Sequence, residues 1–353
     1  MGRRLESTIA LSGLAFVLGC GGDDSARETN TTAPSNTFGT TAGSMATSSG
    51  TTSPADETGP IKLDVMAGTA GSDGIDDGSE SCKNVDLLFV IDNSGSMADE
   101  QANLVASFPG FISAMQKELA ETDGYHIGVV TSDTYIYDLE CSPLSVGNLI
   151  YRTGGPDSSN GSCGPYSSGL NFMTEADDLA LEFGCAAQVG SGGDGDERPM
   201  EAMLTALTPP LTEEGECNEG FLRDDALLVV TIITDEEDDH ETMLEACDST
   251  PLDGSPGEPA TWFDQLVEIK GGREESVVVL ALVGPDGEAA PMCPELDKCN
   301  GGIEGAEVAP RILEFTSMFT YGFVGPVCED YGPIFQESIA VIKTACDEFG
   351  PVG

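Results

Sequence analysis

The chain has 353 residues, enough for one or two domains, and its 62 Asp and Glu residues against 14 Lys and Arg give a formal net charge of −48. Such an acidic excess excludes a nucleic-acid backbone as a partner, because phosphate binding needs a basic surface. It is compatible with divalent cations, with basic partners, or with a solvated surface that stays soluble in salt.

The first twenty residues predict export. Arg3 and Arg4 precede the apolar stretch 9–19, which has the length of a signal-peptide core and is too short to span a bilayer. The stretch ends in VLGC, which resembles a bacterial lipobox with Cys20 as the lipidated first residue of the mature protein. Acyl chains on Cys20 would anchor the protein to the cell envelope, and Gly21 resembles an outer-membrane sorting signal. The alternative is an ordinary secretory signal with a chance cysteine.

Residues 20–80 predict a linker between the signal peptide (1–19) and a folded domain (81–353). They are mostly Ser, Thr, Gly, Ala, Pro and Asp, with almost no large apolar side chain. Such a stretch cannot offset its ordering entropy by burial, so we expect it to be disordered. As a flexible tether of about 60 residues it would reach on the order of 40 Å from the membrane.

After residue 82, apolar runs alternate with amphipathic stretches. We expect buried strands at 85–92, 125–133, 226–235, 276–284 and 320–325. We expect helices at about 104–119, 199–208, 261–271, 309–318 and 333–347, the first kinked at Pro109. This alternation predicts an α/β domain with a mostly parallel sheet. The Gly-, Ser- and Asn-rich segment 134–196 breaks the pattern and is expected to be a disulfide-stapled insertion, with a short edge strand at 147–152.

The cysteines predict disulfides. Eleven are present, so ten remain when Cys20 is set aside, and an even number in an exported chain favours disulfide pairing. No CxxC pair occurs, which argues against a zinc ribbon. We expect the local pairs Cys141–Cys163 and Cys328–Cys346, each closing a loop of about 20 residues.

Polar side chains follow two of the predicted strands at the point where each strand ends. In VDLLFVIDNSGSM, Asp92, Ser94 and Ser96 alternate along a loop, so their oxygens can converge. Asp235 ends the strand in ALLVVTIITD. Carboxyl ends of parallel strands form the ligand-binding rim of an α/β sheet, and such oxygens suit Mg²⁺, Mn²⁺ or Ca²⁺. The sequence therefore predicts a divalent-cation site.

These segments resemble a von Willebrand factor type A (vWA) domain. DNSGSM matches the D-x-S-x-S motif of that family's metal-ion-dependent adhesion site at Asp92, Ser94 and Ser96, and IITDEED matches its second metal aspartate at Asp235. The resemblance covers roughly 83–346. It implies a doubly wound, Rossmann-like α/β fold, with a mostly parallel central sheet flanked by helices. It also implies a cation with one coordination position open for a carboxylate of a partner protein.

One expected ligand is missing. The family adds a threonine from the loop that here is 190–204, which contains none before its helix, and by spacing Glu197 takes that place. A third carboxylate would favour Ca²⁺, fill the open position itself, or weaken binding of an acidic ligand. Thr131 and Thr234 are alternative ligands at neighbouring strand ends. Equally, Glu197 could be a solvated residue in the first turn of a helix.

The acidic run after Asp235 exceeds the needs of one metal. The run could hold a second cation. We expect instead that residues 236–239 form a solvated loop and that only Asp235 is a metal ligand. We expect His126 to be structural and His240 to lie at the surface rather than on a metal.

The functional expectation is an exported, lipid-anchored surface protein that binds a divalent cation and, through it, a protein or glycoconjugate partner. One alternative is a cell-envelope protein in which the cation is only structural. Another is a metal-assisted hydrolase using the acidic cluster and His240, although neither histidine lies in a recognisable catalytic motif. Nucleotide binding is not expected, because the acids of the Gly-rich stretch 190–197 would repel a phosphate.

Overall fold

The structure, a computed structural model, describes residues 82–349 except 121, 140, 142–143, 239–253, 288 and 297–304. The predicted signal peptide, the lipidation site at Cys20, the linker and His240 lie outside the described residues. In the described part, no helix is long and apolar enough to cross a membrane.

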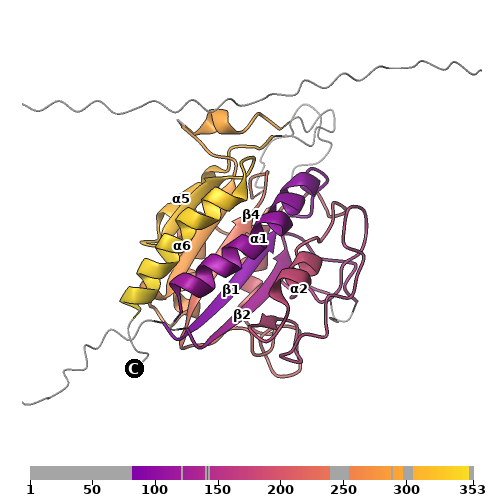
Figure 1. The fold of residues 1–353 in the computed structure, drawn as a ribbon. Coiled ribbons are helices and arrows are strands. Elements are labelled where there is room, and N and C mark those ends of the chain that lie inside the picture. Colours follow the sequence, from indigo (N-terminus) through magenta and orange to yellow (C-terminus); the bar gives the residue numbers. More distant parts are fainter. Residues whose placement is uncertain are drawn as a thin grey trace, which may run out of the picture. The chain divides into compact units, whose positions relative to one another are not determined.

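A six-stranded sheet forms the centre of the domain, in the order β3-β2-β1-β4-β5-β6 (Figure 1). Its strands are β1 (Asn84–Ile91), β2 (Gly124–Thr131), β3 (Met173–Thr174), β4 (Ala226–Ile233), β5 (Val277–Val283) and β6 (Gly322–Pro326). Neighbouring strands are parallel except for the short β3, which runs antiparallel to β2. The predicted doubly wound α/β fold with a mostly parallel sheet is confirmed.

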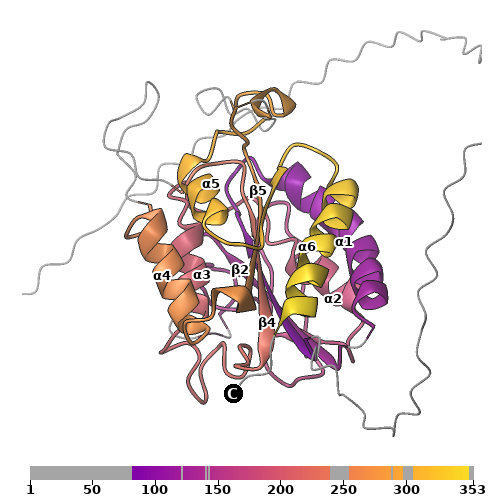
Figure 2. The same cartoon turned by 90° about the vertical axis from the view of Figure 1, so that its left-hand side faces the viewer.

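Helices cover both faces of this sheet (Figure 2). One face carries α1 (Ala98–Glu118), α2 (Leu179–Ala186) and α6 (Tyr331–Glu348). The other carries α3 (Pro199–Ala206), α4 (Pro259–Ile269) and α5 (Pro310–Ser317). Two short 3₁₀ turns, Glu274–Ser276 and Ala290–Met292, lie in the connections. Successive β1 side chains alternate between the faces, so Phe89 packs under the first group and Val90 under the second.

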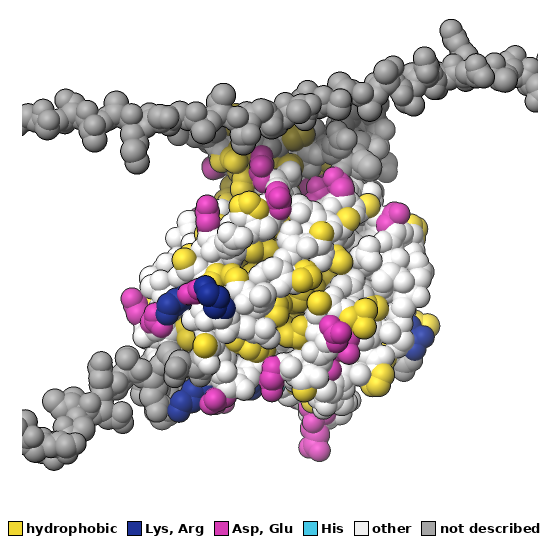
Figure 3. Space-filling view, viewed as in Figure 1, with side chains coloured by type: hydrophobic (Ala, Val, Ile, Leu, Met, Phe, Trp, Pro, Cys, Tyr) yellow, Lys and Arg dark blue, Asp and Glu magenta, His cyan; other side chains and the backbone are white. Residues whose placement is uncertain are grey.

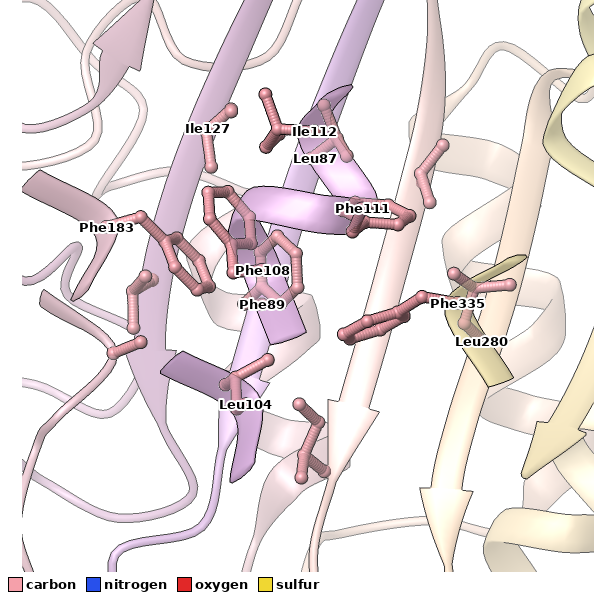
Figure 4. Close-up of a cluster of buried hydrophobic side chains, with 14 of the residues drawn as sticks. Leu87, Phe89, Leu104, Phe108, Phe111, Ile112, Ile127, Phe183, Leu280 and Phe335 are labelled. Atoms are coloured by element: carbon pink, nitrogen blue, oxygen red, sulfur yellow. The ribbon is translucent and has the colours of Figure 1, made fainter. Parts of the chain in front are cut away.

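Aromatic side chains hold the first face together (Figure 4). Phe89 of β1 lies with its ring centroid 4.7 Å from Phe183 of α2, and Phe183 stacks on Phe108 of α1. Phe111 of α1 contacts Phe335 of α6, with centroids 4.7 Å apart. One buried cluster thus joins the sheet to three helices.

Helix α1 continues as a single helix through Pro109.

The insertion differs from expectation in two ways. It contains β3 and α2, which the sequence pattern did not indicate. The edge strand is β3, and the predicted strand at 147–152 is not formed. In that segment the N–H of Ile150 donates a hydrogen bond to the carbonyl of Val129 (2.8 Å). A stretch so rich in Gly and Ser has no apolar period to reveal such short elements.

Both predicted disulfide pairs are wrong, although all four cysteines are disulfide-bonded. The observed pairs are Cys82–Cys346, Cys141–Cys217, Cys163–Cys185 and Cys293–Cys328. Proximity in sequence misled the prediction, because the fold brings distant segments together: Cys346 near the end of α6 meets Cys82 just before β1, with Cα atoms 4.8 Å apart. Cys247 and Cys299 lie outside the described residues.

Candidate metal centre

The candidate site lies where β1 and β4 end side by side. Ile91 and Ile233 are register partners, so both strands leave the sheet at the same edge. The N–H of Asp92 then donates to the carbonyl of Ile233 (3.0 Å). Parallel pairing therefore places the D-x-S-x-S loop beside the segment that begins with Thr234 and Asp235.

Hydrogen bonds fix the D-x-S-x-S loop. The N–H of Ser94 donates to Oδ1 of Asp92 (2.7 Å), and the hydroxyl of Thr234 donates to Oδ2 of Asp92 (2.6 Å). The hydroxyls of Ser94 and Ser96 lie 3.2 Å apart. All four side chains are buried. Burial raises the pKa of Asp92, although these donors oppose that rise.

Asp235 is fully buried, and neither of its carboxylate oxygens accepts a hydrogen bond. Burial, followed by the negative charge of Asp92, raises the pKa of Asp235 to about 8, while the nearby Ser96 hydroxyl lowers it. An ionised carboxylate in the interior without such partners is costly. The group therefore requires either a proton or a cation.

Glu197 belongs to the same carboxylate cluster. It is fully buried and precedes α3, which begins at Pro199, so the alternative of a solvated residue in the first helical turn is wrong. Burial and the charge of Asp92 hold the pKa of Glu197 well above its ordinary value, whereas the Ser132 hydroxyl lowers it. Glu197 and Asp235 therefore each lie within electrostatic reach of Asp92 at this edge of the sheet.

The two threonine alternatives differ in position. Thr234 contacts Asp92 directly, as described above. Thr131, at the end of β2, instead donates its hydroxyl to the carbonyl of Asp133 (3.2 Å), which closes its own loop.

The acidic run is not a solvated loop where the structure describes it. Glu236 and Asp238 are buried. Asp238 accepts the Ser255 hydroxyl (2.6 Å) and pairs with Arg311 of α5 (3.3 Å). Glu237 accepts the backbone N–H of Arg311 (2.7 Å). Residues 236–238 therefore tie the end of β4 to α5, a role that spacing alone does not reveal.

Gln101 is a positioning residue that the sequence reading missed. Its Nε2 donates to the carbonyls of Asp92 (3.0 Å) and Gly190 (2.9 Å), and its Oε1 accepts the N–H of Gly190 (2.9 Å). It fastens the insertion to the end of β1. The signal was present, because this polar residue lies on the helix face that Leu104 and Phe108 bury in the core.

The donor set fits a hard divalent cation. Hydroxyl and carboxylate oxygens converge, and the oxygens of Asp235 make no hydrogen bond. Within the described residues no group of three His, Cys, Asp or Glu is arranged to hold a metal alone, so the hydroxyls of Ser94 and Ser96 would have to contribute. His126 lies near the opposite end of β2, where its Nδ1 contacts the Phe221 carbonyl (2.7 Å).

Comparisons with known proteins give no family. No protein-family model and no curated protein matches the sequence. Similar solved structures include two crystal forms of proximal thread matrix protein 1 from the mussel byssus, each 12% identical over 74% of this chain, with a TM-score of 0.37. The chain spans about half the length of those chains (49% and 48%). At this level the likeness does not bear on function.

Proposed function

We propose that the chain is a vWA-like binding module that holds Mg²⁺, Mn²⁺ or Ca²⁺ and uses the cation to bind a carboxylate of a partner protein or glycoconjugate. Asp92, Ser94, Ser96, Asp235 and Glu197 would form the site. The observation that carries the proposal is the buried Asp235, whose oxygens accept no hydrogen bond beside the D-x-S-x-S loop.

Each residue would have a distinct role. Ser94 and Ser96 would offer hydroxyl lone pairs. Asp92 is held by the Ser94 N–H and the Thr234 hydroxyl, which leaves each of its oxygens a further lone pair. Asp235 and Glu197 would supply negative charge in a site from which water is largely excluded. The cation would provide the positive charge that attracts the partner's carboxylate.

The location of the module forms part of the same proposal. Four disulfides among the described residues favour an oxidising compartment. An exported lipoprotein anchored at Cys20, in the outer membrane or at the cell surface, agrees with them. A binding role is favoured over hydrolysis because neither histidine lies in a recognisable catalytic sequence motif.

Thermal unfolding of the oxidised protein tests the cation site. After chelation, Mg²⁺, Mn²⁺ or Ca²⁺ is titrated into the parent, into Asp92→Ala, and into Asp264→Ala, which removes an exposed carboxylate on α4. We expect the cation to raise the Tm of the parent and of Asp264→Ala but not that of Asp92→Ala. A ligand at 100 times its Kd stabilises the folded protein by about 2.7 kcal/mol.

Equal responses of all three proteins would contradict the site. A purely structural cation is distinguished by a second measurement, binding of an Asp-containing peptide with and without EDTA. If the cation stabilises the protein but the peptide does not bind, the cation has a structural role only.

A further inference from the structure

A groove of about 450 Å³ lies beside the D-x-S-x-S loop. Asn93 of that loop forms part of its wall, and the insertion with its two flanks supplies the rest, including residues 133–137 and 192–194. The N–H of Gly193 donates to the carbonyl of Asn93 (2.8 Å), and a Cβ at Gly193 would clash with the Asn93 side chain. The groove and the candidate metal loop are therefore built against each other.

A buried carboxylate and aromatic rings line the groove. Asp133 is only 6% exposed; one of its oxygens accepts the N–H of Asp194 (2.9 Å), and the other has no hydrogen-bond partner. Tyr135 and the half-buried Tyr137 lie edge to face, with centroids 5.6 Å apart. Ile136 is 59% exposed at the same segment. Such a lining suits a side chain with an apolar stem and a hydrogen-bond donor at its tip.

Charge selects among such side chains. Asp133 and Asp194 line the groove, and Arg198, the one basic residue among its described lining residues, already pairs with Glu201 (3.1 Å). The buried carboxylates of the candidate metal centre lie next to it, and the whole chain carries −48. On the face shown in Figure 3, acidic side chains are scattered around the outline while Lys and Arg appear in few places. A cationic group is therefore complementary, and a tyrosine ring adds a favourable cation–π contact.

We propose that this groove receives a lysine or arginine side chain of the partner, next to the carboxylate that the cation binds. The partner then presents an acidic and a basic residue close together in its chain. The acidic half of this recognition rests on the proposed function, whereas the basic half depends on the groove alone.

Synthetic peptides test the two halves separately. Glycine- and serine-based peptides carry Asp and Lys separated by one to four residues, and matched peptides replace Lys by Gln, Asp by Asn, or both. Fluorescence anisotropy measures their binding to the full chain, with the stabilising cation and with EDTA. We expect the best Asp–Lys peptide to bind roughly ten-fold more tightly than its Asp–Gln counterpart.

Three variants locate the effect. Asp133→Asn and Tyr137→Leu should reduce the Lys-to-Gln preference to near one. Glu214→Gln, which removes an exposed carboxylate from the segment preceding β4, should retain it. A preference that survives in both groove variants would place the basic side chain elsewhere and overturn the inference.

The remaining outcomes separate the two proposals. Equal binding of the Lys and Gln peptides, with a metal-dependent preference for Asp over Asn, overturns the groove inference and supports the proposed function. Indifference to Asp, with a Lys preference that persists in EDTA, does the reverse. A neutral oligosaccharide that displaces the Asp–Gln peptide, in the absence of any Lys preference, would make a saccharide the occupant instead.

Discussion

Among single residues, Glu197 has opposite effects on the stability of the cation-free protein and on cation binding. It stands where the resembling family would place a threonine, and it is buried against the negative charge of Asp92. Repulsion between buried carboxylates destabilises a cation-free site, while the same charge strengthens attraction for a cation.

Replacing Glu197 by threonine tests this balance. We expect Glu197→Thr to stabilise the cation-free protein by about 2 kcal/mol, because one buried carboxylate is removed. The stabilisation by Ca²⁺ should shrink more than that by Mg²⁺, since Ca²⁺ takes more oxygen ligands. Denaturant unfolding with EDTA and with each cation measures both effects. Glu214→Thr, at an exposed position, is the control, and a Glu197→Thr protein less stable than the parent in EDTA would refute the argument.

At the scale of elements, the last helix is attached at both ends. Cys328, shortly before α6 begins at Tyr331, is bonded to Cys293, and Cys346 near its end is bonded to Cys82. The N–H of Cys82 also donates to the carbonyl of Cys346 (3.1 Å). These links join α6 to the start of β1, the strand that leads to the candidate site.

The disulfides that close the longest and the shortest loop among the described residues should differ in their contribution to stability. Cys82–Cys346 spans 264 residues and Cys163–Cys185 spans 22. Because a longer closed loop removes more entropy from the unfolded chain, we expect Cys82→Ser/Cys346→Ser to lose roughly 5–6 kcal/mol and Cys163→Ser/Cys185→Ser about 3 kcal/mol. Unfolding in guanidinium chloride measures both. An equal or larger loss for the shorter loop would show that strain or packing, rather than chain entropy, dominates.

For the whole molecule, buried carboxylates make stability depend on pH. Burial is the leading cause that raises the pKa of Asp86 to about 6, Glu237 to about 7, Asp235 to about 8 and Glu100 to about 9. Near neutral pH the folded protein therefore binds protons that the unfolded chain has released. Its stability should fall as the pH rises from the unfolded values near 4 through these folded values.

The Tm of the chelated protein should therefore decrease between about pH 5 and pH 9, because the free energy of unfolding falls by ~1.4 kcal/mol for each unit of pKa shift in a titrating group. A saturating divalent cation should reduce this decrease, because it replaces protons at Asp235 and its neighbours. Repeating the series at about 1 M NaCl separates the buried groups from repulsion at the acidic surface, which salt screens. A Tm that rises with pH in EDTA would contradict the assignment.

The principal strands, most of the helices and the motif at the end of β1 could be predicted from the order of the amino acids. Their patterns are local. An apolar run such as 226–233 predicts a strand without reference to other segments, and D-x-S-x-S follows its strand directly. Asp92 and Asp235 could be predicted to share a rim because carboxyl ends of parallel strands meet at one edge.

Which distant groups meet depends on how the helices and strands pack. Cys82 and Cys346 pair because β1 and α6 pack together, and Gln101 reaches Gly190 because α1 docks on the sheet. The burial of Glu197, the Arg311 contacts of Asp238 and the groove at Asp133 likewise arise between segments far apart in the chain. No local period encodes such contacts, because their free energy depends on partners that only the folded chain brings within reach.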